Sequence, residues 1–385
     1  MKKPVKIALA VLLSLFGLFF VALLCLGVSI LAYSARDKKF YARAQREHIA
    51  ALEEAYSQSD YISVSDIDIT GFDIPAAVES GARLNDIRFL GTHNSYKAYN
   101  PSAEKLMQRI IAPLHLADGG EWSYGYEPLS AQFDKGIRSI ELDVMREKDG
   151  FRCAHIPVVD YASNCPDFAL ALKEIALWSD VHPGHLPITA LVEAKDTILS
   201  GGMLFHRFNL DDALLLDEMA AGAFGASLYT PAQMLGVHGD FSELRAVNGY
   251  PLLAGLLGKV IVIFHYHVTA TDAYVAHDPT LRTQSMFPSI GEWAYYEDEG
   301  IDDSYACFLI DNWSDSPAME ENTRVKNMLV RTRVDVFPWR DDEWEAQAMS
   351  TGAFILTTDF PPRDDPGDDP HVASFEGGAT VDWRK

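Results

Sequence analysis

The chain has 385 residues, of which 48% are hydrophobic and 23% are charged. This composition is ample for a core of one large or two ordinary domains, and it excludes an intrinsically disordered chain. The formal net charge of -23 disfavours contact with a phosphate backbone, so we expect no nucleic-acid partner, and no feature of the sequence identifies a protein partner.

The N-terminus is predicted to cross a membrane. Residues Ile7 to Tyr33 contain no charge, and the run is long enough to span a bilayer as one helix. Cleaved signal peptides usually have a shorter apolar core, so we favour an uncleaved anchor over residues 1–35, with a removed signal as the alternative. Basic residues flank the run on both sides and give little guide to orientation. A short basic N-terminus before a large domain is typical of an anchor whose body is exported, so we expect a single-pass protein with its domain outside the cytoplasm.

The segments on either side of the main body have their own compositions. Residues 36–80 are expected to form a helical stalk, rich in Ala, Arg, Glu and Lys, followed by a linker. Residues 363–385 are polar, acidic and rich in Pro and Gly, which is typical of an irregular tail. The domain proper is therefore expected over residues 81–362.

Eight short apolar runs within the body are predicted to be strands. Several are continuous and rich in Val and Ile, as buried parallel strands are, and helix-like stretches lie between them. The pattern predicts an α/β fold, a (β/α)8-type TIM barrel preceded by the transmembrane helix. The runs are Ile87–Leu90, Ile137–Val144, Phe151–Ala154, Ile188–Val192, Val260–Phe264, Cys307–Ile310, Val330–Val334 and Phe354–Leu356.

Polar residues follow or end successive strands of this barrel. Chemistry in such barrels takes place at the carboxyl ends of the strands, so these residues are expected to meet there. They include His93 and Asn94 after the first run, Glu141 and Asp143 in the second, His155 after the third, Glu193 and Lys195 at the fourth, His265 and His267 after the fifth, Asp311 after the sixth, Arg333 in the seventh and Asp359 after the eighth.

Two carboxylates separated by one residue indicate a cation site. Glu141 and Asp143 point to the same face of a strand, and two buried like charges need a cation between them to stay ionised. Asn94 adds an amide oxygen and Glu193 a third carboxylate, and oxygen donors of this kind suit Ca²⁺ or Mg²⁺. The alternative is a solvated edge strand without a metal.

Two histidines beside these carboxylates are candidate acid and base groups. His93 and His155 could exchange protons near neutral pH, as phosphoryl transfer requires. Lys195 could neutralise a phosphate oxygen or only balance Glu193, and Arg333 is a similar candidate for substrate binding. His265 and His267 are interpreted as structural or rim residues, and Asp311 and Asp359 as residues that support the site from behind or lie in loops.

Other histidines and the cysteines remain outside the candidate site. His182 and His185 precede the fourth strand and are expected at the opposite end of the barrel. Cys153 and Cys165 flank His155 and could form a disulfide in an oxidising compartment, which the sequence leaves open.

The segments LNDIRFLGTHNSY, FDKGIRSIELDV, CAHIPVVDYASNC and WSDVHPGHLPITALVEAKD resemble the calcium-dependent phosphoinositide-specific phospholipase C-like family of bacteria and fungi. The resemblance covers about residues 84 to 361 and implies a distorted TIM barrel of the phosphodiesterase superfamily. It implies that His93 and His155 are catalytic, and that Ca²⁺ is held by Asn94, Glu141, Asp143 and Glu193.

The reaction that the resemblance implies is attack of the inositol 2-hydroxyl on the phosphorus of a phosphoinositide-type lipid. His93 would stabilise the pentavalent phosphoryl group, and His155 would protonate the departing diacylglycerol oxygen to leave a cyclic inositol phosphate. Another phosphodiester with a neighbouring hydroxyl remains a possible substrate.

Two other functions compete with this one. A glycerophosphodiester phosphodiesterase shares the barrel and a paired carboxylate site, but typically has His-Arg-Gly after the first strand, where this chain has His93-Asn94-Ser95. A surface protein that binds lipid or glycan without catalysis is the other alternative.

Overall fold

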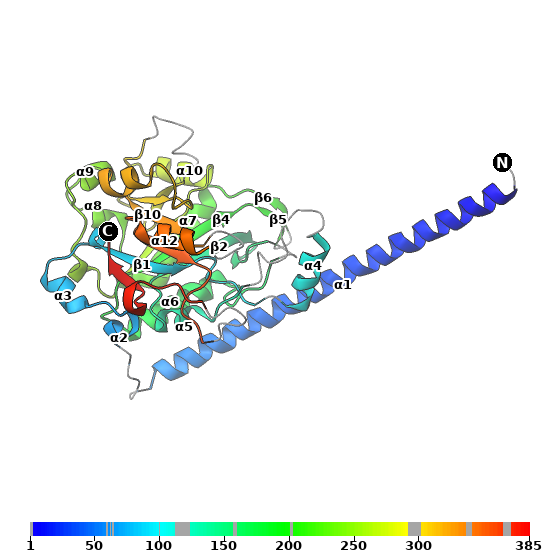
Figure 1. Cartoon of the computed structure of the whole chain (residues 1–385), viewed down its shortest axis with the longest axis horizontal. Helices are drawn as coiled ribbons and strands as arrows, with labels where there is room; N and C mark the ends of the chain where they lie inside the picture. The colour runs from blue at the N-terminus through cyan, green and yellow to red at the C-terminus, as the bar shows by residue number, and fades with distance from the viewer. Residues whose placement is uncertain are drawn as a thin grey trace.

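The computed structural model describes residues 3–58, 61, 63, 65–99, 101–111, 124–156, 160–200, 203–291, 302–335, 341–364 and 371–385. Within these ranges one closed barrel forms the body of the molecule, and one long helix extends far beyond it (Figure 1).

Eight parallel strands close into the barrel, which confirms the predicted fold. Each strand pairs with the next in chain order, and the last returns to the first. The pairing of the first strand with the second, which closes the barrel, is limited to one aligned pair, Gly91 and Ser139. A Cβ at Gly91 would lie 2.8 Å from the Cβ of Ser139, so this approach requires glycine. The strands are β1 Ile87–Thr92, β2 Ser139–Glu147, β4 Ile188–Lys195, β7 Val260–Phe264, β8 Phe287–Gly291, β9 Phe308–Ile310, β10 Leu329–Arg333 and β11 Ile355–Thr358.

Alternation along the strands separates two apolar cores. One fills the barrel and includes Phe89, Leu191 and Ile263. The other lies between the strands and the surrounding helices and includes Leu142 and Val192. Because neighbouring residues of a strand point to opposite faces, the residues on either side of Leu142 point into the barrel.

Helices and short segments surround the barrel (Figure 1). The longer ones have capped N-termini: the Asp167 side chain accepts from the Leu170 amide at 3.3 Å, and Asn209 caps the next long helix. The α-helices other than the first are α2 Asp66–Thr70, α3 Ile74–Glu79, α4 Ser102–Ile111, α5 Leu129–Asp134, α6 Phe168–Val181, α7 Leu210–Phe224, α8 Pro231–Leu235, α9 Phe241–Ala246, α10 Ala270–His277 and α12 Asp342–Ser350. The short 3₁₀ or π turns are η1 Leu84–Asp86, η3 Gly225–Ser227, η4 Leu253–Gly255, η5 Glu321–Val325 and η6 Glu376–Gly378.

One predicted barrel strand is wrong, and one barrel strand escaped prediction. The run Phe151–Ala154 belongs to β3 Gly150–Cys153, which folds back antiparallel on β2 as a hairpin and stays outside the barrel. Its place is taken by β8, whose sequence Phe-Pro-Ser-Ile-Gly contains two residues that are rare within strands. A second hairpin, β5 Thr197–Ser200 with β6 Met203–His206, follows β4.

The prediction of an irregular tail is wrong at its end. β12 Val381–Trp383 pairs antiparallel with β1 at the sheet edge. Val381 is buried in the barrel core, and Asp382 forms an ion pair of 2.6 Å with Arg88. An apolar residue facing in and a charged neighbour facing a cation are enough to hold this short strand.

The region expected as stalk and linker is structured differently from that prediction. α1 Lys3–Tyr56 is one continuous helix, and its second half lies against the barrel. The linker contains α2 and α3, and Asp66 at the start of α2 forms a buried ion pair with Arg138. Within the described residues, α1 is the helix long and apolar enough to cross a membrane, and its apolar window contacts nothing in the structure.

Candidate active site

Three carboxylates meet inside the barrel at the carboxyl ends of β2 and β4. Asp143 of β2 is aligned with Glu193 of β4. Glu141 lies two residues before Asp143 on β2 and points to the same face. Oxygens of the three side chains lie within 4.8 Å of one another. Parallel register and alternation therefore bring together three of the four residues that the sequence predicted as metal ligands.

Two basic side chains partly neutralise this cluster. Lys195 Nζ binds Glu193 and lies 3.3 Å from Asp143 Oδ2, while Arg331 reaches across the barrel from β10 to bind Glu141. Burial is the largest influence on all three acids and raises their pKa, but for Glu141 the neighbouring positive groups, Arg331 first among them, together outweigh it and lower the pKa. Lys195 likewise lowers the pKa of Glu193. For Asp143 burial prevails and raises the pKa to about 7.

The cluster fits a hard cation. It holds three carboxylates and two basic groups, and Asp143 Oδ1 is buried with no hydrogen-bond partner among the described residues. A buried carboxylate oxygen without a donor is costly, and a bound cation would satisfy it. Oxygen donors of this type are those that Ca²⁺ prefers.

Asn94 lies beside the cluster, in the turn after β1. Its φ of 52° is left-handed, a conformation that asparagine tolerates better than most residues. The Tyr96 hydroxyl bridges Asn94 Oδ1 at 3.2 Å and Asp143 Oδ2 at 3.0 Å, and Asn94 Nδ2 donates to the Tyr124 hydroxyl at 3.0 Å. The Tyr96 hydroxyl therefore links the amide oxygen of Asn94 to the carboxylate of Asp143.

His93 is held by the buried carboxylate of Asp359, which the sequence placed among supporting or loop residues. Its Nδ1 lies 3.0 Å from Asp359 Oδ1, because β1 and β11 are paired and each ends just before one of these two residues. Arg333 binds the other oxygen of Asp359 at 3.1 Å. Burial, reinforced by Arg333, lowers the pKa of His93 and favours its neutral form. With Nδ1 donating to Asp359, Nε2 is the nitrogen left for substrate.

His155 has a closely similar environment. Its Nδ1 lies 2.8 Å from Asp160 Oδ2, and the other oxygen of Asp160 binds the buried Lys97. Burial would raise the pKa of Asp160, but the hydrogen bond from His155 and the charge of Lys97 lower it. Each candidate catalytic histidine therefore contacts an aspartate that in turn contacts a cation.

Both residues predicted to bind substrate are paired with acids of the site. Lys195 contacts Glu193 and Asp143, and Arg333 contacts Asp359. His265 lies at the rim, with Nε2 3.9 Å from Glu193 Oε2, and His267 Nε2 lies 3.3 Å from Asp196.

Three residues of the site were missed by sequence reasoning, Lys97, Asp160 and Arg331, and the contact of Asp359 with His93 was not foreseen. Signals for two of them were present. Arg331 is two residues before Arg333 and must share its strand face, and Asp160 is close enough to His155 in sequence for a short loop to bring it back.

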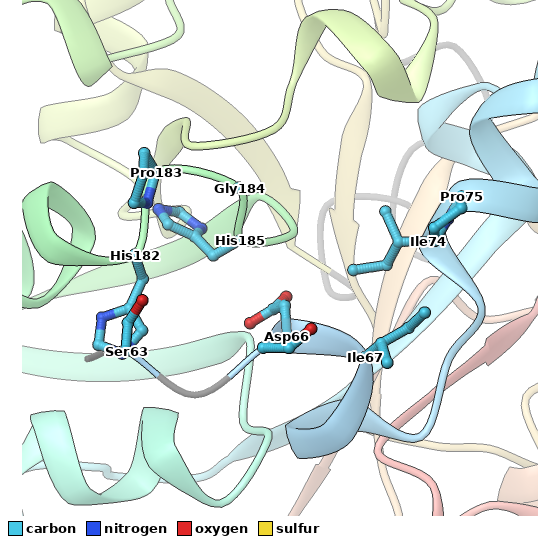
Figure 2. A pocket seen from close by; sticks show the side chains of 10 residues that line it. Ser63, Asp66, Ile67, Ile74, Pro75, His182, Pro183, Gly184 and His185 are labelled. Atoms are coloured by element: carbon cyan, nitrogen blue, oxygen red, sulfur yellow. The ribbon is translucent and has the colours of Figure 1, made fainter.

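A pocket lies at the end of the barrel opposite the candidate active site (Figure 2). It has a volume of about 330 Å³ between the start of α2 and the turn before β4. Asp66 here accepts from the Leu186 amide at 2.7 Å besides pairing with Arg138, and His182 stacks on Trp178. His185 is bonded on both nitrogens. These polar groups have structural partners, and both histidines lie at the end that the sequence predicted.

Cys153 and Cys165 are buried free thiols. Burial, together with the neighbouring Cys153, raises the pKa of Cys165 well above its usual value. The disulfide that the sequence left open is not formed in this structure.

Comparison with known proteins gives one family and one fold. Residues 82–151 and 145–383 match the family described as phosphoinositide phospholipase C, Ca²⁺-dependent. None of the curated proteins compared with the chain matches it.

Among solved structures, the chain resembles a calcium-dependent phosphoinositol-specific phospholipase C from Pseudomonas sp, with 19% identity and a TM-score of 0.55 over 82% of this chain and 99% of that one. It also resembles a Ca²⁺-dependent phosphatidylinositol-specific phospholipase C from Streptomyces antibioticus, with 18% identity and a TM-score of 0.52 over 72% of this chain and 94% of that one. At these identities the structural likeness concerns the fold.

Proposed function

The chain belongs to the Ca²⁺-dependent phosphoinositide phospholipase C family, and from that premise we propose that it is a membrane-anchored enzyme that cleaves a phosphoinositide-type lipid headgroup. The family makes it a phosphodiesterase with Ca²⁺ as its cofactor. The products proposed are diacylglycerol and a cyclic inositol phosphate, formed by attack of the inositol 2-hydroxyl on the phosphorus.

The observation that carries this proposal is the pair of histidine–aspartate contacts beside the carboxylate cluster. A cyclising cleavage needs one group near the phosphoryl oxygens and another that protonates the leaving oxygen. Two imidazoles, each with Nδ1 held by a buried aspartate, supply both with Nε2 directed to substrate.

The proposed calcium ligands are Glu141, Asp143 and Glu193, with Asn94 beside them. Ca²⁺ bound there would lower the pKa of the attacking hydroxyl and neutralise phosphate charge. Lys195 and Arg331 hold the carboxylates in place and limit their mutual repulsion.

The two histidines receive different roles. His93, whose neutral form is favoured, would accept the proton of the attacking hydroxyl at Nε2, and the imidazolium so formed would donate to the phosphoryl group, with Arg333 adding positive charge next to it. His155, oriented by Asp160, would donate its proton to the diacylglycerol oxygen as that oxygen departs. Burial of Asp160 and Asp359 keeps both contacts away from water.

Membrane attachment is proposed through the apolar part of α1, with the barrel on the exported side. The length and composition of α1 support the span, and the layout of a short basic N-terminus before a large domain supports export.

Product analysis tests the proposal. Full-length protein in vesicles containing phosphatidylinositol, with Ca²⁺ present, should release a cyclic inositol phosphate detectable by phosphorus NMR. His93→Ala and His155→Ala should each lower kcat by roughly 10³-fold. The exposed His277 serves as the matched control, and His277→Ala should leave kcat unchanged.

Two outcomes would replace the proposal. With the deacylated lipid glycerophosphoinositol as substrate, release of glycerol 3-phosphate would indicate a glycerophosphodiester phosphodiesterase. Binding of phosphatidylinositol without turnover of any phosphodiester would indicate a lipid-binding protein.

A further inference from the structure

The second half of α1 lies along the barrel wall beside α6. The Gln45 amide exchanges two hydrogen bonds of 2.9 Å with the backbone of Asp167, where α6 begins. One and two turns further on, His48 Nε2 lies 3.1 Å from the buried Glu174, and Glu53 pairs with Lys173 at 2.6 Å. This half of α1 is therefore docked on the domain and does not stand off from it.

The order of these contacts gives the direction of α1. α6 starts after the β2–β3 hairpin at the active-site end, and its C-cap His182 lies at the opposite end before β4. α1 meets the start of α6 at Gln45, and beyond its end Tyr61 packs on His182 with ring centroids 6.3 Å apart. The two helices are therefore parallel, and α1 runs from the active-site end of the barrel to the other end.

The turns of α1 before Gln45 lie at the active-site mouth. The Tyr161 hydroxyl donates to Asp37 at 2.7 Å, and Tyr161 is the residue next to Asp160, which holds His155. The Tyr41 hydroxyl donates to the carbonyl of Tyr99, in the loop after β1.

The contact with the barrel begins where the apolar run ends. Ser34 is buried, whereas the described side chains of the apolar window before it are exposed. Asp37 follows Tyr33 by four positions on the helix, a rise of about 6 Å. The end of the span and the loop that carries His155 are therefore about one helical turn apart along the same helix.

On this geometry, and resting on the proposed function and span, we propose that α1 orients the barrel. The docked helix holds the active-site mouth against the surface of the bilayer that the same helix spans. The enzyme then cleaves lipids of its own membrane, in the leaflet on the C-terminal side of the span.

Side chains around the mouth fit a lipid surface. Exposed apolar or aromatic residues occur on α4, on the β5–β6 hairpin and on loops that follow β1, β7 and β9; they are Tyr99, Leu106, Phe205, Val268 and Trp313. Tyr and Trp favour the membrane interface. The exposed face of α4 also carries Lys105 and Arg109, which attract anionic headgroups. Figure 1 shows α4 and the β5–β6 hairpin on the side of the barrel from which α1 projects.

A polarity-sensitive fluorophore tests the orientation directly. It is attached to Leu106→Cys at the mouth or, as the matched control, to Val237→Cys, an exposed site in the turn after α8, in a full-length Cys25→Ser background. In vesicles of phosphatidylcholine and phosphatidylinositol, the label at 106 should shift to the blue and resist quenching by iodide, while the label at 237 should behave as in water. Equal quenching at both sites would overturn the proposal. This readout needs no turnover, so the proposed orientation can fail while the proposed function stands. Equally, the orientation can hold in a protein that shows no turnover.

A flexible insertion tests whether this orientation of the barrel speeds the cleavage of lipid. A long Gly/Ser segment between Tyr33 and Ser34 leaves the membrane anchor and the docked half of α1 intact. It removes the rigid helical connection between them. Turnover of phosphatidylinositol in the same vesicle should fall by about tenfold or more, because the mouth is no longer held at the surface. Hydrolysis of a water-soluble inositol phosphodiester should be unchanged, which also shows that the barrel is folded. Equal lipid turnover with and without the insertion would contradict the proposal.

Discussion

Histidine, aspartate and cation recur as a group on both sides of the carboxylate cluster. Asp359 contacts His93 and Arg333, and Asp160 contacts His155 and Lys97. An aspartate that accepts from Nδ1 fixes the tautomer and the direction of the ring, and the histidine and the cation together lower the pKa of that buried aspartate. Each histidine thus depends on a residue that does not itself meet substrate in the proposed reaction.

Asp359→Asn tests this dependence. The Asn amide can donate to Nδ1 and so favours the tautomer with its proton on Nε2, which is the wrong one for His93. We expect kcat for phosphatidylinositol to fall by roughly 10²–10⁴-fold with KM nearly unchanged. Asp240→Asn is the matched control, since Asp240 caps α9 and Asn caps a helix equally well. A purely structural role for Asp359 would instead lower the thermal midpoint and leave kcat of the folded fraction intact.

The carboxylate cluster could be predicted from sequence because two neighbouring strands carry it. Glu141 and Asp143 share a face by alternation, and strand order brings Glu193 beside them, so this cluster follows from local pattern. The contacts of Asp359 with His93 and of Arg331 with Glu141 depend on which strands are neighbours and on the width of the barrel. Those distances are set by closure of the whole sheet, which no local pattern reveals.

At the scale of elements, the sheet is extended by a strand from the end of the chain. β12 covers the start of β1, and Val381 is inserted into the core that also contains Phe89. The strand is only three residues long, so the buried side chain contributes more to its attachment than the ladder does.

Truncating that side chain measures its contribution. Val381→Ala should lower the free energy of unfolding by about 2 kcal/mol, since it removes buried methyl groups and leaves a cavity. Val372→Ala, at an exposed position of the same tail, should change it by less than about 0.5 kcal/mol. Denaturant unfolding of the full chain in detergent gives both values. Equal effects of the two substitutions would mean that β12 is not attached in solution.

The barrel strands were predictable from sequence where they contain a continuous apolar run. Seven of the eight barrel strands coincide with continuous apolar runs, whereas β8 contains Pro288 and Gly291 and gave no such signal. β3 was recognised as a strand, but its antiparallel pairing was not. That pairing follows from a two-residue turn after β2, and composition alone did not distinguish such a turn from the longer connection between parallel strands. α1 is similar: its helical composition was evident, but docking along α6 depends on partners such as Glu174 that are distant in sequence.

At the scale of the whole molecule, stability depends on a histidine far from the active site. His185 Nδ1 donates to the Leu186 carbonyl and its Nε2 accepts from the Ser179 hydroxyl, so the neutral ring is satisfied at the closed end of the barrel. Burial lowers its pKa to about 4. In the unfolded chain the value is about 6.5, so between these two pH values only the unfolded state takes up the proton.

This difference predicts a loss of stability in acid. The stabilisation is complete above pH 6.5 and is lost as the pH falls towards 4, at about 1.4 kcal/mol per pH unit for one proton. Unfolding of the full chain in detergent at a series of pH values should therefore show a shallower slope for His185→Gln than for the wild type in this window. Parallel curves would show that His185 does not contribute to the acid sensitivity.

The central claim is that three carboxylates from two neighbouring strands hold the Ca²⁺ on which cleavage depends. Its most direct test is the turnover of phosphatidylinositol by the full chain in vesicles as free Ca²⁺ is titrated, for the wild type and for Asp143→Asn. We expect wild-type turnover to rise to saturation, to stop on chelation and to return when Ca²⁺ is restored, with the Asp143→Asn curve displaced to at least about tenfold higher Ca²⁺. Turnover that persists in chelator, or two superimposable titrations, would contradict the account.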